Sequence, residues 1–240
     1  MDVDGREYWI TAKHLLTGQD APYGTPEKSV TLDILNPNEP TDHWMPTHFT
    51  VLDPGFGIDI VVLAADQLLS PRASGMKMAT QTSVGADCTF IGYPYGATYR
   101  ARFPDGIYYR IAFTKHCTVS NRIGVKADGS DLAWWLDGIN NGGFSGGPVL
   151  QNTGDQQVVF GVISGYHFDI AQVYKKPAEK KATKQSAKVP STGNKTSPQI
   201  EKPAMPTDSY VKENSGLILA FDIDHAKKAI EANPIGPKRP

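Results

Sequence analysis

The stretch NNGGFSGGPVL (residues 140–150) places four glycines around Phe144 and Ser145. Glycine loses more backbone entropy on folding than any other residue, so such a cluster indicates a turn with unusual dihedral angles or the close approach of another group. The flanking runs PVLQ (148–151) and QVVFGVIS (157–164) predict strands. The stretch is therefore either a flexible loop between two strands or a turn whose backbone wraps around the Ser145 hydroxyl.

Short strand-like runs bounded by Gly, Pro, Asn and Asp recur along the whole 240-residue chain. They are rich in Val, Ile, Thr and aromatic residues, as strands are. They lie at 7–12, 29–35, 56–65, 87–94, 108–119, 132–137, 147–152, 157–164 and 215–223. A helical pattern occurs only near the end, where Asp222 or Asp224 can cap a helix over 224–232 that Pro234 stops. Many short strands with one terminal helix predict an all-β barrel or sandwich.

Composition and charge set limits on the class of protein. The chain is 40% hydrophobic with a formal net charge of −1, and its longest apolar run, GIDIVVLAA (57–65), is far too short to cross a bilayer. Cys88 and Cys117 lack metal-site spacing, and they could form one bridge or remain two buried thiols. The opening MDVDGREYWI has no secretory signal, which predicts a cytoplasmic protein.

A lysine-rich segment interrupts the strand pattern near the end. Residues 175–202 carry eight lysines and two glutamates, and 175–209 contain almost no aromatic or β-branched apolar residues. Such a segment cannot bury enough surface to offset its ordering entropy, so we expect 175–209 to be disordered. The alternative is a basic arm for nucleic acid or an anionic membrane, but the absence of interleaved arginines and aromatics argues against it.

Three polar residues in apolar or glycine-rich surroundings suggest catalysis. In WITAKHLL, His14 stands at the end of a predicted strand of β-branched and aromatic residues. Asp59 lies inside the apolar run GIDIVVL, and Ser145 lies in the glycine stretch. A serine hydroxyl becomes a nucleophile when an imidazole takes its proton, and a carboxylate must orient that imidazole. Backbone N–H groups of a glycine turn can stabilise the resulting oxyanion. Taken singly, each residue has an ordinary structural explanation, and their order His, Asp, Ser favours the joint interpretation.

The chain at this point resembles the trypsin-like (chymotrypsin-fold) serine peptidases, and the bacterial members more closely than the animal digestive enzymes. ITAKH is similar to the family's T-A-x-H segment, DIVVL to its D-I-A-x-L segment and GFSGGP to its G-x-S-G-G-P segment. Further similarity lies in GADCTFIGYPYG, VFGVISG and SGLILAFDIDHAKKAI, so the resemblance spans most of residues 5–232.

The resemblance implies a role for each matching residue. Ser145 would be the nucleophile, His14 the general base and then acid, and Asp59 the orienting carboxylate. The N–H groups of Gly143 and Ser145 would form the oxyanion hole, and Ser164 would hydrogen-bond Asp59. The implied activity is hydrolysis of a polypeptide substrate through an acyl-enzyme, with no cofactor and no metal.

The implied fold consists of two antiparallel β-barrels with the active site between them. The expected division is a first barrel over 1–70, a link over 71–84 and a second barrel over 85–232, followed by a tail over 233–240. The second barrel would include the disordered insertion 175–209 and the helix 224–232.

Several positions depart from the family pattern. Lys13 stands where a small residue is usual, and Phe144 replaces the aspartate that pairs with a newly cut N-terminus in animal members, which argues against activation by such a cleavage. Ile139, Tyr166 and Gly216 fall in the region of the primary specificity pocket. These residues argue against a choice of Lys or Arg and favour small apolar side chains. The departures keep open a rival hypothesis, a weak or inactive peptidase fold that serves as a binding module.

The beginning of the chain adds one more expectation. DVDG (2–5) predicts a hairpin turn that leads into the strand carrying His14, and the first arm of that hairpin is missing from the sequence. A missing arm would leave an unpaired edge. We therefore expect a reading frame that extends upstream of Met1.

Overall fold

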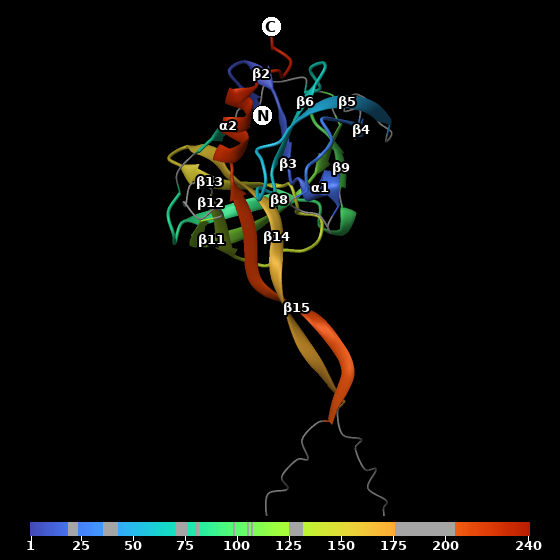
Figure 1. Ribbon diagram of the computed structural model, residues 1–240, viewed down its shortest axis with the longest axis vertical. Coiled ribbons are helices and arrows are strands. Elements are labelled where there is room, and N and C mark those ends of the chain that lie inside the picture. The colour runs from blue at the N-terminus through green and yellow to red at the C-terminus, as the bar shows by residue number, and fades with distance from the viewer. Residues whose placement is uncertain are drawn as a thin grey trace, which may run out of the picture. The chain divides into compact units, whose positions relative to one another are not determined.

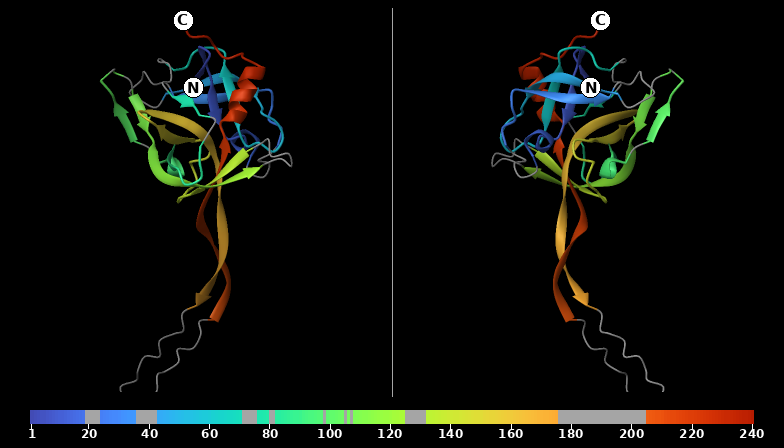
Figure 2. Two further views of the ribbon diagram at one scale, coloured as in Figure 1. Left: turned by 90° about the vertical axis from the view of Figure 1, so that its left-hand side faces the viewer. Right: turned by 90° about the vertical axis from the view of Figure 1, so that its right-hand side faces the viewer.

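The computed structural model of the chain describes residues 1–18, 24–35, 43–70, 76–79, 82–97, 99–104, 106, 108–124, 132–175 and 205–240. It divides into two compact units. The first comprises Met1–His167 and Asn214–Pro240, and the second comprises Phe168–Glu213. All predicted site residues belong to the first unit, which Figure 1 and Figure 2 show from three sides.

A four-stranded antiparallel sheet in the order β3-β6-β5-β4 carries the residues that position His14 and Asp59. Its strands are β3 (Trp9–Thr11), β4 (Ser29–Leu35), β5 (Trp44–Leu52) and β6 (Val61–Ala65). All five residues of β6 are buried, because its side chains alternate between two covered faces. Val62 and Ala64 pack in one hydrophobic cluster, and Val61, Leu63 and Ala65 pack in another. The one-turn helix α1 (His14–Thr17) begins shortly after β3 ends.

A seven-stranded sheet in the order β13-β8-β11-β12-β15-β14-β7 contains the other predicted strands, and β13 also pairs with β14. Its members are β7 (Lys77–Met78), β8 (Asp87–Gly92), β11 (Phe113–Gly124), β12 (Leu132–Asp137), β13 (Pro148–Thr153), β14 (Gln156–Lys175) and β15 (Met205–Asp222). The hairpin of β9 (Tyr99–Arg102) and β10 (Tyr108–Ile111) and the 3₁₀ turn η1 (Pro94–Gly96) lie between β8 and β11 in the chain.

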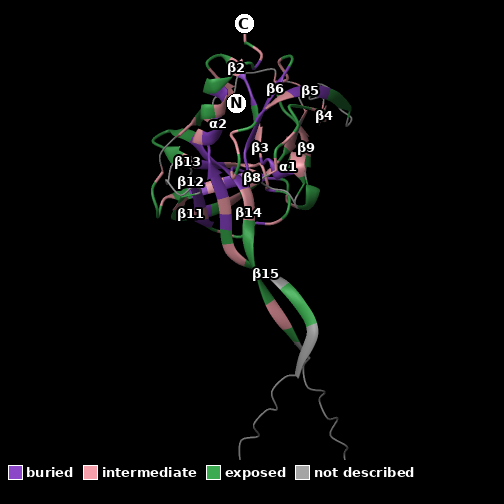
Figure 3. Ribbon diagram, viewed as in Figure 1, coloured by how far each residue is buried: buried purple, intermediate pink, exposed green. Residues whose placement is uncertain are grey.

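Both sheets contribute to one hydrophobic core. Ile58, Ile60 and Val62 of the first half pack in the same cluster as Val162 and Phe221 of the second. The terminal helix α2 (Asp224–Ala232) spans the residues predicted for it and covers this cluster with Ala226 and Ile230. Figure 3 shows the buried residues concentrated where β14, β15 and α2 meet the first sheet.

The predominantly β architecture with one terminal helix is confirmed. The pairings do not establish two separate barrels, because the seven-stranded sheet also takes in β7 from the predicted link, parallel to β14. Most of the expected disordered insertion, 176–204, lies outside the described residues. At its two ends the expectation is wrong, because Lys175 ends β14 and residues 205–209 begin β15, and these two strands pair with each other.

The N-terminal hairpin has the first arm that the sequence seemed to lack. β1 (Asp2–Val3) pairs with β2 (Arg6–Glu7), and the turn between them takes the left-handed backbone at Asp4 (φ 49°) and Gly5 (φ 72°). Two-residue hairpin turns require this conformation.

The C-terminal tail pairs with the same hairpin. Glu7 N donates to Pro237 O (3.0 Å), Arg239 N donates to Gly5 O (2.8 Å), and Arg6 and Lys238 form a bridge. The tail therefore covers an edge of β2 that would otherwise be open.

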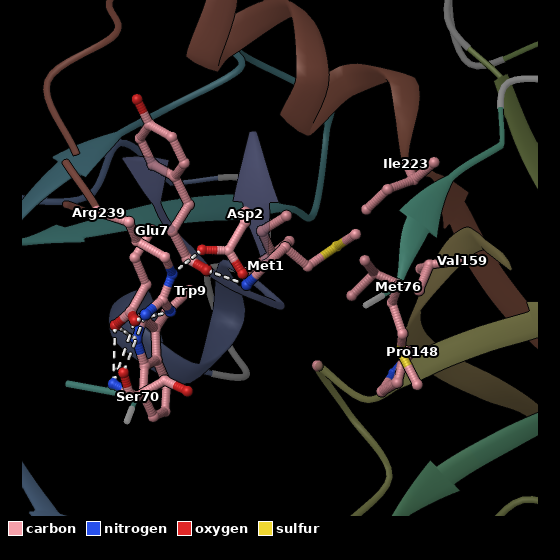
Figure 4. Close-up of a pocket in the computed structure, with 14 residues that line it drawn as sticks. Met1, Asp2, Glu7, Trp9, Ser70, Met76, Pro148, Val159, Ile223 and Arg239 are labelled. Atoms are coloured by element: carbon pink, nitrogen blue, oxygen red, sulfur yellow. Dashed lines mark hydrogen bonds and ion pairs between the residues drawn. The ribbon is translucent and has the colours of Figure 1, made fainter. Parts of the chain in front are cut away.

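Figure 4 shows a cavity of about 350 Å³ beside this hairpin. Glu7, Asp2 and Arg239 form its polar end, where Arg239 Nη2 lies 2.6 Å from Glu7 Oε2, and apolar side chains such as Met76 and Ile223 form the other. His14, Asp59 and Ser145 do not line this cavity.

Candidate active site

The buried carboxylate of Asp59 lies directly beside His14. Asp59 is fully buried in the run between β5 and β6, and His14 begins α1 with only 8% of its surface exposed. The His14 backbone N–H donates to Asp59 Oδ1 (2.8 Å), and His14 Nδ1 lies 2.7 Å from Asp59 Oδ2. A carboxylate is costly to bury without such partners. The arrangement fixes the ring with Nε2 as the remaining nitrogen for proton transfer.

Ser164, near the middle of β14, contacts both the carboxylate and the predicted nucleophile. Its hydroxyl donates to Asp59 Oδ2 (2.5 Å), and its carbonyl oxygen accepts a hydrogen bond from Ser145 Oγ (3.3 Å). The structure thus brings His14, Asp59, Ser145 and Ser164 together from four separate segments. In this structure the hydroxyl of Ser145 is directed to Ser164 rather than to His14.

Three of the four glycines of the nucleophile turn (residues 139–147), Gly143, Gly146 and Gly147, are required by close contacts. A Cβ atom on Gly143 (φ 100°) would lie 2.1 Å from Tyr93 O, and one on Gly146 (φ 80°) would lie 2.1 Å from Thr11 Oγ1. The second contact joins the turn to the strand that leads to His14. The glycine cluster is therefore a turn wrapped closely against its neighbours, as the second interpretation of the sequence required.

The orientation of one peptide bond in the turn bears on the predicted oxyanion hole. Tyr95 N donates to Gly142 O (2.8 Å), and Tyr93 N donates to Gly143 O (2.9 Å). In a trans peptide the N–H points opposite to the C=O. The Gly142 C=O and the Gly143 N–H belong to the same peptide group. Because this C=O points toward Tyr95 N, the Gly143 N–H points away from Tyr95.

The residues predicted for the specificity pocket are largely exposed. Ile139 is 65% exposed and Tyr166 is 40% exposed. Gly216 (φ 78°) accepts a hydrogen bond at its carbonyl oxygen from Gly138 N (2.8 Å). This bond links the segment before Ile139 to β15, while the selectivity of these residues stays a prediction.

Two lysines that sequence reasoning did not place in the site support the loops that carry it. The Lys13 ammonium group, fully buried, lies 2.5 Å from Asp53 Oδ1 and donates to Gly55 O (2.7 Å). Lys115 of β11 donates to Ile139 O (2.9 Å). The unusual Lys13 in a strand-like run was a visible signal, whereas nothing local in the sequence indicates the contact of Lys115.

Neither a metal cluster nor a membrane-spanning helix is found in the part of the chain that the structure describes. No group of three or more His, Cys, Asp or Glu side chains there is arranged to hold a metal ion. Likewise, none of the described helices has the length and apolar character needed to cross a bilayer.

The sequence has no match among protein-family models or curated proteins, but solved structures resemble it. A variant of the HtrA-type protease AlgW, solved with a tripeptide, is 14% identical, covers 97% of this chain and 54% of its own, and has a TM-score of 0.50. AlgW with a decapeptide is 15% identical, and the match covers 96% of this chain and 48% of the AlgW chain, with a TM-score of 0.48. The Rv3671c protease of M. tuberculosis in its inactive form is 21% identical, and the match covers 65% of this chain and 66% of that protease chain, with a TM-score of 0.39.

At these identities the likeness concerns the fold alone. The chain spans about half the length of the AlgW chains. The chain therefore shares its overall fold with the AlgW variant.

Proposed function

We propose that the chain is a serine endopeptidase that cleaves polypeptides through an acyl-enzyme, with the two-barrel organisation of the trypsin-like class. The observation that carries the proposal is the chain of contacts from His14 through buried Asp59 to Ser164 and on to Ser145. These contacts support the roles that the resemblance to the trypsin-like peptidases implies for the four residues.

The chemistry begins with a rotation of the Ser145 hydroxyl from Ser164 O toward His14 Nε2. The hydroxyl oxygen attacks the scissile carbonyl carbon while the imidazole takes its proton, and Asp59 stabilises the resulting imidazolium. The N–H groups of Gly143 and Ser145 stabilise the oxyanion. The imidazolium then protonates the leaving amine as the C–N bond breaks. Water attacks the acyl-enzyme by the same steps and restores the Ser145 hydroxyl.

The present hydrogen bond of Ser145 does not exclude this mechanism. Catalytic hydrogen bonds are often long or misaligned in the free enzyme and form only with substrate bound. The same bond is, however, the observation that favours the rival function, a binding module whose serine never meets His14.

A fluorophosphonate probe distinguishes the two functions. We expect one covalent adduct at Ser145 at neutral pH, lost in Ser145→Ala and slowed by several orders of magnitude in His14→Ala. Ser120→Ala, at an exposed position of β11, is the matched control and should label like the wild type. If folded wild-type protein resists the probe, or if labelling persists in Ser145→Ala, the peptidase proposal is wrong.

A further inference from the structure

The nucleophile turn is fixed at several points along its length. The backbone of Tyr93 and Tyr95 bonds to its glycines on one side. On another side, Asn140 Nδ2 donates to Gly165 O (3.4 Å), and Asn214 Nδ2 donates to Asn140 O. The side-chain amide of Asn141 also donates to Tyr95 Oη (3.3 Å). The carbonyl oxygen of Ile139 and the side-chain oxygen of Asn141 bond to a different group.

That group is the ammonium of Lys115, which projects from β11 toward the turn. It donates to Ile139 O (2.9 Å) and to the side-chain oxygen of Asn141. It also lies 5.1 Å from the centre of the Phe144 ring, close enough for a cation–π interaction. A single charged group thus contacts three of the six residues that immediately precede Ser145.

The third contact reaches the residue next to the nucleophile. Phe144 is fully buried and packs edge-to-face against Phe90 of β8, with ring centroids 4.9 Å apart. A Cβ on Gly92 would lie 2.6 Å from the Phe144 ring, so this ring has no room to move toward β8. The ammonium group and Phe90 therefore hold Phe144 from different elements of the sheet.

The chemistry of the Lys115 contacts is unlike that of an ordinary surface lysine. Among the residues that the structure describes, no carboxylate pairs with its ammonium group, and its neutral oxygen partners both belong to the nucleophile turn. Hydrogen bonds from a charged donor are roughly twice as strong as neutral ones. They can oppose the backbone freedom of the two glycines, Gly142 and Gly143, that follow Asn141.

We propose that Lys115 is a positioning residue that holds the nucleophile turn so that the Gly143 N–H faces the oxyanion. This inference rests on the proposed peptidase function. Lys115 acts through the turn and touches no reacting atom. Without the ammonium group, Ile139 O and the Asn141 side chain lose their charged donor. The Gly142–Gly143 peptide keeps the bond from Tyr95 N to Gly142 O but is held less firmly, because the residues before it are no longer restrained. The oxyanion hole is then formed in only part of the population.

The test compares Lys115→Met with the wild type in turnover of a peptide substrate. Methionine keeps most of the length of the side chain and removes the donor. Loss of one oxyanion donor lowers kcat by about 10²–10³-fold in a serine protease. We expect a smaller loss of about 10- to 100-fold in kcat for partial misplacement of the turn, with KM nearly unchanged. Lys115→Arg should recover part of the loss, and Lys77→Met, at an exposed position of β7, should behave as the wild type.

A second readout separates this inference from the proposed function. Hydrogen–deuterium exchange over residues 139–147 should be faster in Lys115→Met than in the wild type, whether or not the protein cleaves peptides. If Lys115→Met does not fold, Asn141→Ala takes its place, because it removes one acceptor of the ammonium group without altering Lys115. It should lower kcat and speed exchange, as expected for Lys115→Met. Inactivity of the wild type would refute the peptidase proposal alone. Unchanged kcat and unchanged exchange in Lys115→Met, or in Asn141→Ala if Lys115→Met does not fold, would overturn the role of Lys115.

Discussion

Replacement of Lys13 by methionine tests whether a buried ion pair sets the geometry beneath His14. Lys13 is fully buried, and its ammonium group contacts Asp53 and Gly55, which lie in the turn that leads to Asp59. Since His14 follows Lys13 directly, the pair joins the segment that carries His14 to the loop that leads to Asp59.

The magnitude of the effect follows from the burial of the two partners. Removing one member of a fully buried pair costs about 3–5 kcal/mol. The Asp53 side chain keeps 25% of its surface exposed and can be partly rehydrated. A charged hydrogen bond contributes about 1.5–3 kcal/mol, so we expect Lys13→Met to lower the free energy of unfolding by about 2–3 kcal/mol. For a chain of this size, that corresponds to a fall of about 4–12 °C in the thermal midpoint.

The assay is a double-mutant cycle of Lys13→Met, Asp53→Asn and the two together, measured by urea unfolding. Contacting partners should show a coupling of about 1 kcal/mol or more. Lys227→Met is the control, because Lys227 is 41% exposed and lies 3.8 Å from Glu231, in a surface pair of little energetic value. A strictly additive cycle, or a Lys13→Met protein as stable as Lys227→Met, would refute the reasoning.

Three further predictions concern packing, pH and oxidation. A Cβ on Gly147 would lie 2.0 Å from a backbone oxygen of β8, so Gly147→Ala should lower the free energy of unfolding by about 3 kcal/mol. Gly142 has open space around it, so the free energy of unfolding of Gly142→Ala should lie within about 1 kcal/mol of the wild-type value. Burial raises the pKa of Asp222 above 3.8. The folded state therefore binds this proton more tightly than the unfolded chain. The free energy of unfolding of the wild type should fall, relative to that of Asp222→Asn, as pH rises from the ordinary pKa through the raised pKa. A difference between the two proteins that does not change with pH contradicts this prediction. The sulfurs of Cys88 and Cys117 lie 2.8 Å apart on paired strands, so excess oxidised glutathione should convert both thiols to one intrachain disulfide. A thiol titration that still finds two free thiols after this treatment would contradict the prediction.

The strands and the predicted site could be inferred from sequence because their signals are local. Short apolar runs bounded by turn residues mark β8 and β13, and Pro234 lies just beyond the end of α2. The residue at the N-cap of α2 is Ile223, not Asp222 or Asp224 as the sequence suggested. The glycine turn was identifiable because close backbone approach leaves glycine as the residue that fits. His14 and Asp59 were identifiable from short motifs, but the expectation that both belong to strands is wrong, because His14 begins α1 and Asp59 precedes β6. The contacts among these residues still required the structure.

Other features depend on contacts between distant segments and left no local signal. The C-terminal tail completes the N-terminal hairpin through Arg239 and Glu7, which are separated by most of the chain. β7 lies in a segment that reads as a link, and its pairing with β14 is set by the neighbouring sheet. The contact of Lys115 with Ile139 likewise joins two elements that only folding brings together.

The two lysines perform the same physical task in the two halves of the site. Lys13 donates to Gly55 O in the loop before Asp59, and Lys115 donates to Ile139 O in the loop before Ser145. Each loop contains glycines, and each must be held still because hydrogen-bond geometry at the reacting atoms tolerates little displacement. A disulfide could fix such a loop, but Cys88 and Cys117 lie opposite each other on paired strands, so a bond between them would join β8 to β11 and neither loop. Charged donors to backbone carbonyls therefore supply the restraint, and both loops should loosen when these lysines are neutralised.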